Sequence, residues 1–484
     1  MNPATVASGA RTCALAALSL ALPGCPLSDK YFIDSDAGIP NAGGFKGVGG
    51  SLVLAGSGGS VAGATASGGA SSAGSSSVAP CIASQCSGTC CNGACVDDLT
   101  NNPSNCGSCS NPCAAGQACV SSVCTSGWST MAPPPAGFVA REMAAYVGFG
   151  DRLFIFGGQD VNGINFGDGA IYNALTNRWK MVSIDANAPS PRRLATAVWT
   201  GSVILVYGGR VDVAGVAFSD GAAYNPTTDK WSTLTKSGTG RVGPIGAATS
   251  SQAVFWGGWG TSNIFLGGAE RIDLTTSVWQ ATTLADPGII DNTAYAFTGQ
   301  YLLSFGGRLG GTTKTNSAAS YDLITNSWIS VPAVTGTSVV SARWGAFGVW
   351  DGSTFTVWGG RDETSAKNNG QYNSVGGWTE IPYQAGAAPT ARWAPARQTG
   401  WAFARKTGDL LFIGGQDFNG ICLGDGARYV AGSGTSAASW TPIPRWKLAE
   451  DHLWGAAAYV GGALVVWGGL TGTELSSNGE RWTP

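Results

Sequence analysis

The chain has 484 residues, of which 44% are hydrophobic, 12% are charged and 74 are glycine. This length exceeds what one compact core usually holds, so we expect several structural units. Few charges and abundant glycine are atypical of helical bundles and coiled coils, which are rich in Glu, Lys, Leu and Ala. The formal net charge is −2 and no run of basic residues occurs, which argues against nucleic-acid binding.

Residues 1–24 have the features of an export signal. Arg11 precedes an apolar run, residues 13–22, that is too short for a stable membrane anchor. The segment Leu-Pro-Gly-Cys25 then resembles a bacterial lipobox, in which the cysteine is lipidated and becomes the mature N-terminus. An ordinary secretory signal is the alternative. Because Pro26 rather than Asp follows the cysteine, the resemblance implies the outer membrane or cell surface of a Gram-negative bacterium, with the lipid as the only membrane contact.

Residues 25–80 are predicted to be a flexible tether that begins at the lipidated Cys25. Ser51–Ser77 is almost wholly Gly, Ser, Ala and Val. Such a composition buries too little apolar surface to offset the entropy of ordering the chain, and no strand or helix pattern is present. A coil of this length spans on the order of 40 Å, so it would hold the following domains away from a membrane.

A cysteine-rich segment, residues 81–124, follows the tether. Ten cysteines among few large apolar residues predict a disulfide framework in an exported chain. Zinc is the alternative, since Cys106-x-x-Cys109 has half of a zinc-site spacing, although no His lies nearby. The patterns Cys-Cys-Asn-Gly-Ala-Cys-Val-Asp and Asn-Cys-Gly-Ser-Cys resemble small Cys-rich modules of myxobacterial surface proteins. Cys422, far away in the sequence, is predicted to be a free buried thiol. The cysteines predicted to pair are Cys81, Cys86, Cys90, Cys91, Cys95, Cys106, Cys109, Cys113, Cys119 and Cys124.

Residues 125–484 repeat with a period of roughly 50 residues. In each repeat a glycine doublet closes a short apolar run, and an aromatic residue, turn residues and a Trp usually follow, as in Tyr224 to Trp231. Short unbroken apolar runs are typical of strands covered on both faces, and the aromatic–turn–Trp pattern predicts a hairpin. The doublets begin at Gly157, Gly208, Gly257, Gly306, Gly359, Gly414 and Gly468.

Seven such repeats in register resemble kelch repeats, which implies an all-β fold: a seven-bladed β-propeller over residues 125–484. The last repeat ends at Trp482, in the place of the Tyr, and therefore lacks an outer strand. The segment Gly127–Met131 supplies the missing pattern, since Trp128-Ser-Thr matches Trp231-Ser-Thr of another repeat. We therefore predict that this N-terminal strand completes the seventh blade and closes the ring.

Cationic residues recur at two places in the repeat. One place lies 16 or 17 residues before the doublet and the other directly follows it. The kelch resemblance implies that both open on one face, around the mouth of the central channel. Guanidiniums gathered there would attract carboxylates or acidic sugars, because Arg offers a planar donor fork. Pairing with carboxylates or carbonyls inside the fold is the structural alternative. The candidate ligand-binding residues are Arg141, Arg192, Arg210, Arg241, Arg308, Arg343, Arg361, Arg397 and His452.

The residue types present argue against catalysis. Galactose-oxidase-like copper chemistry, which the kelch resemblance brings into consideration, needs two His, and the chain has one. The Asp boxes of sialidases are absent from the sequence. Asp160-Val-Asn-Gly and Asp417-Phe-Asn-Gly contain oxygen ligands that suit calcium, but Asp and Asn beside Gly are first of all turn residues. We predict no catalytic residue, no metal and no cofactor.

The sequence therefore predicts a surface-anchored binding protein that presents a propeller. Its partner would be an anionic protein or glycan held at the channel mouth, because the candidate arginines gather there. The alternative is a kelch-fold enzyme that acts on an acidic sugar, as an epimerase or lyase does. Such an enzyme would need a carboxylate, His or Tyr within hydrogen-bond reach of the sugar.

Overall fold

The computed structural model describes most of the repeat region and parts of the chain before it. The described residues are 50–51, 88–91, 94–96, 99, 105–113, 118–120, 122–125, 127–212, 215–282, 290–309, 313–331, 341–374, 377–381, 384–385, 388–394, 400–405, 408–432, 437–446, 454–471 and 474–483. The predicted signal, Cys25, Cys81, Cys86, Arg397 and His452 lie outside them.

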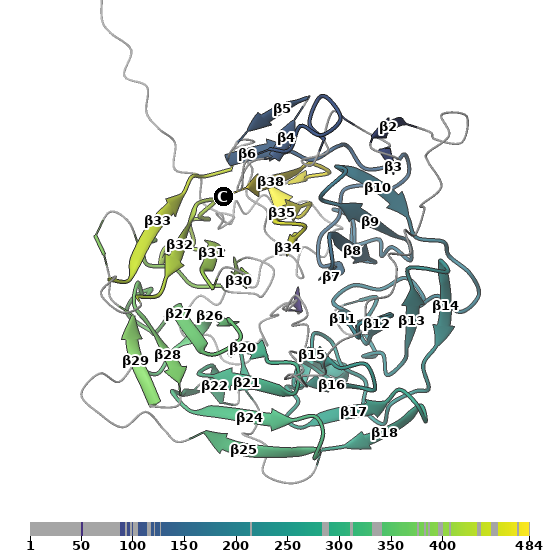
Figure 1. Ribbon diagram of the computed structural model, residues 1–484. Coiled ribbons are helices and arrows are strands. Elements are labelled where there is room, and N and C mark those ends of the chain that lie inside the picture. Colours follow the sequence, from purple (N-terminus) through teal and green to yellow (C-terminus); the bar gives the residue numbers. More distant parts are fainter. Residues whose placement is uncertain are drawn as a thin grey trace, which may run out of the picture.

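Seven antiparallel sheets form a closed ring in the described part of the chain (Figure 1). In each blade the first strand lies at the centre of the ring and the fourth at its periphery. Blades 1 to 4 are β7 (Ala145–Phe149), β8 (Arg152–Phe156), β9 (Gly169–Asn173) and β10 (Arg178–Met181); β11 (Thr196–Trp199), β12 (Ile204–Tyr207), β13 (Gly221–Asn225) and β14 (Lys230–Thr233); β15 (Ile245–Ala248), β16 (Gln252–Trp256), β17 (Ala269–Asp273) and β18 (Val278–Ala281); β20 (Ala294–Phe297), β21 (Tyr301–Phe305), β24 (Ala318–Asp322) and β25 (Ser327–Val331).

Blades 5 to 7 continue the same order, except that the last strand of blade 7 comes from the N-terminal side of the repeats. These blades are β26 (Trp344–Trp350), β27 (Phe355–Arg361), β28 (Gly370–Ser374) and β29 (Gly377–Ile381); β30 (Gly400–Ala404), β31 (Leu410–Gly414), β32 (Gly426–Val430) and β33 (Ser439–Ile443); β34 (Ala456–Val460), β35 (Ala463–Trp467), β38 (Gly479–Thr483) and β6 (Gly127–Thr130). The shorter elements are β1 (Gly50–Ser51), β2 (Thr89–Cys91), β3 (Ala94–Val96), β4 (Ala118–Val120), β5 (Val123–Thr125), the 3-10 turn η3 (Thr261–Asn263), β19 (Ile290–Asp291), β22 (Arg308–Leu309), β23 (Thr313–Lys314), β36 (Leu470–Thr471) and β37 (Glu474–Leu475).

The glycine doublet joins one blade to the next. Gly208 and Gly209 have φ of 74° and 91°, which side chains rarely adopt. The Gly209 N–H donates to the Arg241 carbonyl of the following blade at 2.8 Å. A Cβ on Gly208 would lie 2.3 Å from the same oxygen. The doublet is therefore glycine because the neighbouring blade's backbone occupies the space of a side chain. The same N–H to carbonyl bond joins Gly158 to Arg192, Gly307 to Arg343, Gly360 to Arg392 and Gly469 to Arg141.

The repeated aromatic residues pack the outer half of each blade, as the hairpin prediction requires. Tyr224 and Trp231 are cross-strand partners with ring centroids 5.1 Å apart. The Tyr224 hydroxyl donates to Asp229 in the hairpin turn at 2.6 Å. The Trp231 indole N–H donates to the Ser183 carbonyl of the preceding blade at 2.9 Å. These rings therefore hold both the hairpin and the interface between blades, which confirms their structural role.

The ring is closed by β6, as the incomplete seventh repeat predicts. β6 pairs antiparallel with β38, so that Trp128 lies opposite Trp482. Trp128 is buried, and its indole N–H donates to the Pro444 carbonyl of blade 6 at 2.6 Å. One blade thus contains strands from both ends of the propeller, which removes an open sheet edge.

The cysteine-rich segment lies against blade 7 (Figure 1), and eight of its ten cysteines are disulfide-bonded as predicted, while the other two lie outside the described residues. Arg481 of β38 is buried and donates to the Cys119 carbonyl at 2.8 Å, so the segment is in direct contact with the propeller. Cys106 and Cys109 are in disulfides rather than available as zinc thiolates. The defined pairs are Cys91–Cys109, Cys106–Cys119 and Cys113–Cys124, and Cys90 and Cys95 are also disulfide-bonded.

One prediction for another part of the chain is wrong. Cys422 is disulfide-bonded, not a free thiol. The inference failed because the apolar neighbours of Cys422 indicate burial but carry no information about a distant partner. Gly50–Ser51, within the predicted tether, forms β1, which pairs in parallel with the inner strand β7. A dipeptide with such small residues has no period by which a strand could be predicted. No helix among the described residues has the length and apolarity needed to span a bilayer.

Candidate ligand-binding face

The arginine before each doublet is a clamp inside its own blade. Arg192 is 1% exposed. Its Nε donates to the Ser190 carbonyl at 2.9 Å, and its Nη1 donates to the Gly208 carbonyl at 3.0 Å. The same Nη1 forms an ion pair of 2.8 Å with Asp220, which lies just before β13. The guanidinium thus ties the start of the blade to the doublet and to the third strand.

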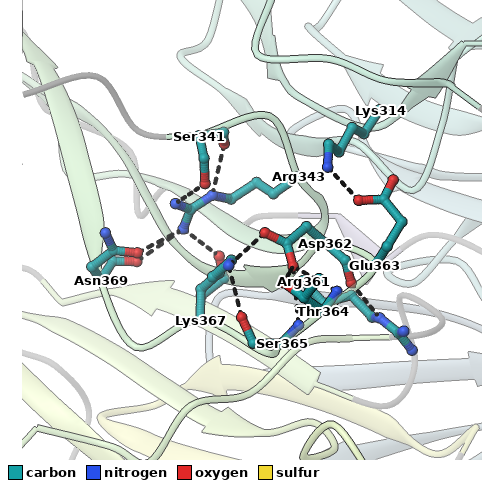
Figure 2. Close-up of polar contacts among 11 residues, drawn as sticks. Lys314, Ser341, Arg343, Arg361, Asp362, Glu363, Thr364, Ser365, Lys367 and Asn369 are labelled. Atoms are coloured by element: carbon teal, nitrogen blue, oxygen red, sulfur yellow. Dashed lines mark hydrogen bonds and ion pairs between the residues drawn. The ribbon is translucent and has the colours of Figure 1, made fainter.

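Four other arginines make the same kind of clamp. Arg141 pairs with Asp168 at 2.7 Å, and Arg392 pairs with Asp425 at 3.0 Å. Arg343 bonds instead to the amide oxygen of Asn369 at 3.0 Å (Figure 2). Burial lowers the pKa of Arg343 to about 10, and Asp362 opposes this shift only in part. Burial also lowers the pKa of the other two arginines, against the opposing effect of their carboxylate partners.

These contacts correct the prediction that the arginines before the doublets bind a ligand. Arg141, Arg192 and Arg343 are each 1% exposed, and Arg241, at 4%, donates to the Gly257 carbonyl at 2.8 Å. Because the fold itself surrounds these guanidiniums, the structural alternative is favoured for them. In the sixth repeat the clamp is Arg392, 22 residues before its doublet. An insertion lengthens this repeat, so the usual spacing of 16 or 17 residues predicts Arg397 in place of Arg392.

The mouth of the channel is formed by pairs of residues that follow the clamp arginine and the doublet. In blade 2 this pair is Arg193 and Arg210, joined by a β-bridge. The arginines predicted after the doublets belong to these pairs, where Arg210, Arg308 and Arg361 are 2%, 7% and 6% exposed, but their partners were missed. A signal was present, since in five of the six pairs the partner directly follows the clamp arginine, as in Ser-Ala-Arg-Trp344. The pairs are Glu142–Gln159, Arg193–Arg210, Val242–Trp259, Asp291–Arg308, Trp344–Arg361 and Trp393–Gln416.

On one side of the rim, arginines stack on aromatic rings. The guanidiniums of Arg308 and Arg361 lie 5.4 and 5.3 Å from the centre of the Trp344 ring. Arg361 also lies 4.7 Å from the Trp393 ring and 4.6 Å from the Phe418 ring. Arg308 is 7% exposed and Arg361 is 6% exposed, so the aromatic residues cover most of both side chains. Trp344 and Trp393 are themselves 3% and 2% exposed, so of these groups only Phe418, at 39%, presents a large surface to solvent.

Carboxylates lie beside these cations, so the rim is not uniformly positive. Glu363 pairs with Lys314, and Asp362 pairs with Lys367 at 2.5 Å (Figure 2). Partial burial would raise the pKa of Asp362, but hydrogen bonds from Lys367, Thr364 and Ser365 hold it well below its usual range. The rim therefore presents alternating charges rather than the purely cationic ring that the sequence suggested.

Loops that follow the doublets project apolar side chains around the mouth. Because the seven sheets repeat one strand order, these loops leave the ring on the same face, which we call the loop face. Seven of the thirteen large apolar side chains exposed in the described ranges lie in these loops. Only two lie in the hairpin turns of the opposite face, Leu175 and Ile324. The loop-face residues are Val161, Ile164, Val211, Val216, Ile264, Leu309 and Phe418.

The Asp-x-Asn-Gly segments build two of these loops. The Asp160 carboxylate accepts hydrogen bonds from the N–H groups of Asn162 and Ile164, both at 2.8 Å. Asp417 does the same for its own turn, at 2.9 and 2.8 Å. The turn interpretation of these segments is thus favoured over the calcium alternative, and the turn holds Val161 and Phe418 outward.

The central channel itself is narrow. It contains a cavity of about 70 Å³ lined by small residues and by rings such as those of Tyr146, Phe347 and Trp401. β1 also lies there, beside the inner strands β7 and β11. The exposed loop face is therefore the larger contact surface.

The match to a family model agrees with this architecture. Residues 107–288 match the model of the KLHDC2/KLHL20/DRC7 Kelch-repeats domain. A stretch of 85 residues is 34% identical to F-box protein AFR of Arabidopsis thaliana, covering 18% of this chain and 21% of that protein. The chain thus spans about a fifth of the length of this relative. The solved "Structure of YjhT" is similar with a TM-score of 0.47 and 15% identity, over 64% of this chain and 99% of that one. Residues 107–288 are thus similar to a kelch-repeat domain, and the described chain folds as a seven-bladed β-propeller.

Proposed function

We propose that the propeller is a binding scaffold whose loop face recognises a protein partner. The observation that carries this proposal is the concentration of exposed apolar side chains on the loops after the doublets. Exposed apolar side chains gathered on one face are typical of protein interfaces. A kelch propeller is also typical of interaction scaffolds, and a rigid ring with variable loops suits this role.

The rim at the centre of the loop face supports a partner with acidic side chains. Interfaces favour Arg and Trp, which combine large contact area with directed hydrogen bonds. Arg308 and Arg361 lie against Trp344 within the surrounding apolar loops. A carboxylate that reached them would be recognised through charge and shape together. A glycan in place of the protein is an outcome that the binding assays below would detect.

We further propose that the propeller acts outside the cytoplasm, at the cell surface. The export-type N-terminus, lipidation of Cys25 and the tether up to residue 80 would attach it to the outer membrane. The disulfides support this location, because they persist in oxidising compartments. Direct contact of the cysteine-rich segment with Arg481 would then place the propeller at the end of the tether.

Site-specific crosslinking tests the proposed face. A photoreactive residue at Ile264, which is 64% exposed on the loop face, should capture a specific protein in the producing cells. The matched control is Ile324, which is 63% exposed in a turn on the opposite face. The captured protein, once purified, should bind the wild-type chain directly. Equal capture at both positions, or a purified candidate that does not bind, would contradict the proposal.

A further inference from the structure

A cleft separates blades 4 and 5 on the face opposite the loop face. Its volume is about 620 Å³, within the range of clefts that hold small ligands, about 300–1,000 Å³. It opens between the β20–β21 turn, which contains Gln300, and the β26–β27 turn, which contains Ser353. Its walls include the aromatic residues Tyr301, Trp350 and Trp378. This cleft is separate from the channel mouth and from the loops discussed above.

The cleft exists because two side chains of blade 4 are small. Between blades 1 and 2, Phe154 and its cross-strand partner Ile171 fill the equivalent space, and Phe154 lies 5.7 Å from the Tyr224 ring. In blade 4 the corresponding cross-strand pair is Leu303 and Ser320. Replacing Phe by Leu and Ile by Ser removes apolar volume that no neighbouring side chain restores.

The cleft also contains hydroxyl groups that have no partner in the fold. Ser320 is 8% exposed, yet its hydroxyl makes no hydrogen bond within the residues that the structure describes. The Tyr301 hydroxyl likewise has no partner within those residues. Both hydroxyls retain contact with solvent, so they are open to hydrogen bonds from a ligand placed in the cleft.

The chemistry of the walls identifies the class of ligand. None of the described residues that line the cleft carries a charged side chain, so an ionic ligand would gain no counter-charge. Aromatic faces pack against the C–H face of a pyranose ring, while hydroxyl and amide groups exchange hydrogen bonds with sugar hydroxyls. The side chains of Ser320, Ser353 and Gln300 supply such groups beside Trp350. We infer that this cleft binds a neutral oligosaccharide.

Titration calorimetry with the full-length chain tests this site. The probes are the neutral trisaccharides maltotriose, cellotriose, mannotriose and chitotriose, with trigalacturonate as the charged comparison. At least one neutral probe should bind at millimolar concentration, and trigalacturonate should bind more weakly. Absence of binding by every neutral probe, or stronger binding of trigalacturonate, would overturn the inference.

Variants locate the binding in the cleft. Ser320→Ile introduces the residue of blade 1 and fills the space, so affinity should fall at least about tenfold without a lower melting temperature. Ser320→Ala keeps the cleft open and should lose less affinity. If Ser320→Ile does not fold, Trp350→Ala provides the same test by removing a stacking surface. Unchanged affinity in the folded variants would overturn the inference. Ile264→Asp, on the loop face, should bind the sugar normally even if the proposed protein interaction fails.

Discussion

The clamp of Arg343 bonds to an amide instead of a carboxylate, and supplying the carboxylate should strengthen it. Asn369 takes the place that Asp168, Asp220 and Asp425 take in other blades, and the Asn369→Asp variant would convert its bond to Arg343 into an ion pair. The guanidinium of Arg343 is charged in both proteins, so the substitution adds only the attraction of a carboxylate, and exposed ion pairs contribute about 0.2–1 kcal/mol. The aspartates of the other clamps are 28 to 42% exposed, so a carboxylate at this place should add about 0.5–1 kcal/mol.

Thermal unfolding at a fixed scan rate measures this gain. The variant should melt roughly 1–2 °C above the wild type at neutral pH. The paired carboxylate has a lower pKa in the folded state than in the unfolded state. Its stabilisation is therefore complete above the unfolded pKa of about 3.9 and is lost as the pH falls through the folded pKa. The advantage should disappear at about pH 2, below both pKa values, where the carboxyl is protonated in both states.

The same substitution in a protein that lacks the Arg343 guanidinium separates the effect of the ion pair from other effects of the substitution. In the Arg343→Met variant, Asn369→Asp should bring no gain, because the new carboxylate has no guanidinium partner. A neutral or destabilising effect in the wild-type background, or a gain that persists at low pH, would refute the clamp interpretation.

Three further predictions concern the ring and the cysteines. Deleting residues 126–133 removes Trp128 and the outer strand of blade 7. Because losing one buried Trp costs about 3–5 kcal/mol, the protein should aggregate or melt at a much lower temperature. An unchanged melting temperature would show that β6 is dispensable. Cys25→Ser should move the protein from the membrane fraction to a soluble exported fraction, whereas a soluble wild type without lipid by mass spectrometry would contradict the anchor. Alkylation without reduction should leave Cys422 unlabelled, and a labelled Cys422 peptide would contradict its disulfide.

The fold was predictable because its signals repeat. Each doublet, as at Gly208, is required by positive φ and by the close approach of the next blade, so the same constraint appears in every repeat. Closure was predictable because the missing outer strand of the last repeat and the surplus segment around Trp128 share one pattern. Local spacing thus determined the order of the strands, the number of blades and the way the ring closes.

The roles of the arginines were harder to predict. The rim position of Arg308 and Arg361 followed from their place after the doublet. The burial of Arg192 could not be predicted in this way. Its partner Asp220 is 28 residues away in the sequence, and the two residues come together only because β12 pairs with β13. The cleft beside Ser320 was equally hidden, since one serine in a strand carries no pattern and its meaning depends on the side chains of blade 5.

The affinity of the crosslinked partner for two variants tests the central claim most directly. Ile264→Asp places a charge in the loop face, and Ile324→Asp places the same charge on the opposite face at nearly equal exposure. We predict that the affinity of the purified partner for the immobilised chain falls at least about tenfold for Ile264→Asp and is unchanged for Ile324→Asp. Equal affinities for the two variants, or a loss confined to Ile324→Asp, would contradict recognition through the loop face.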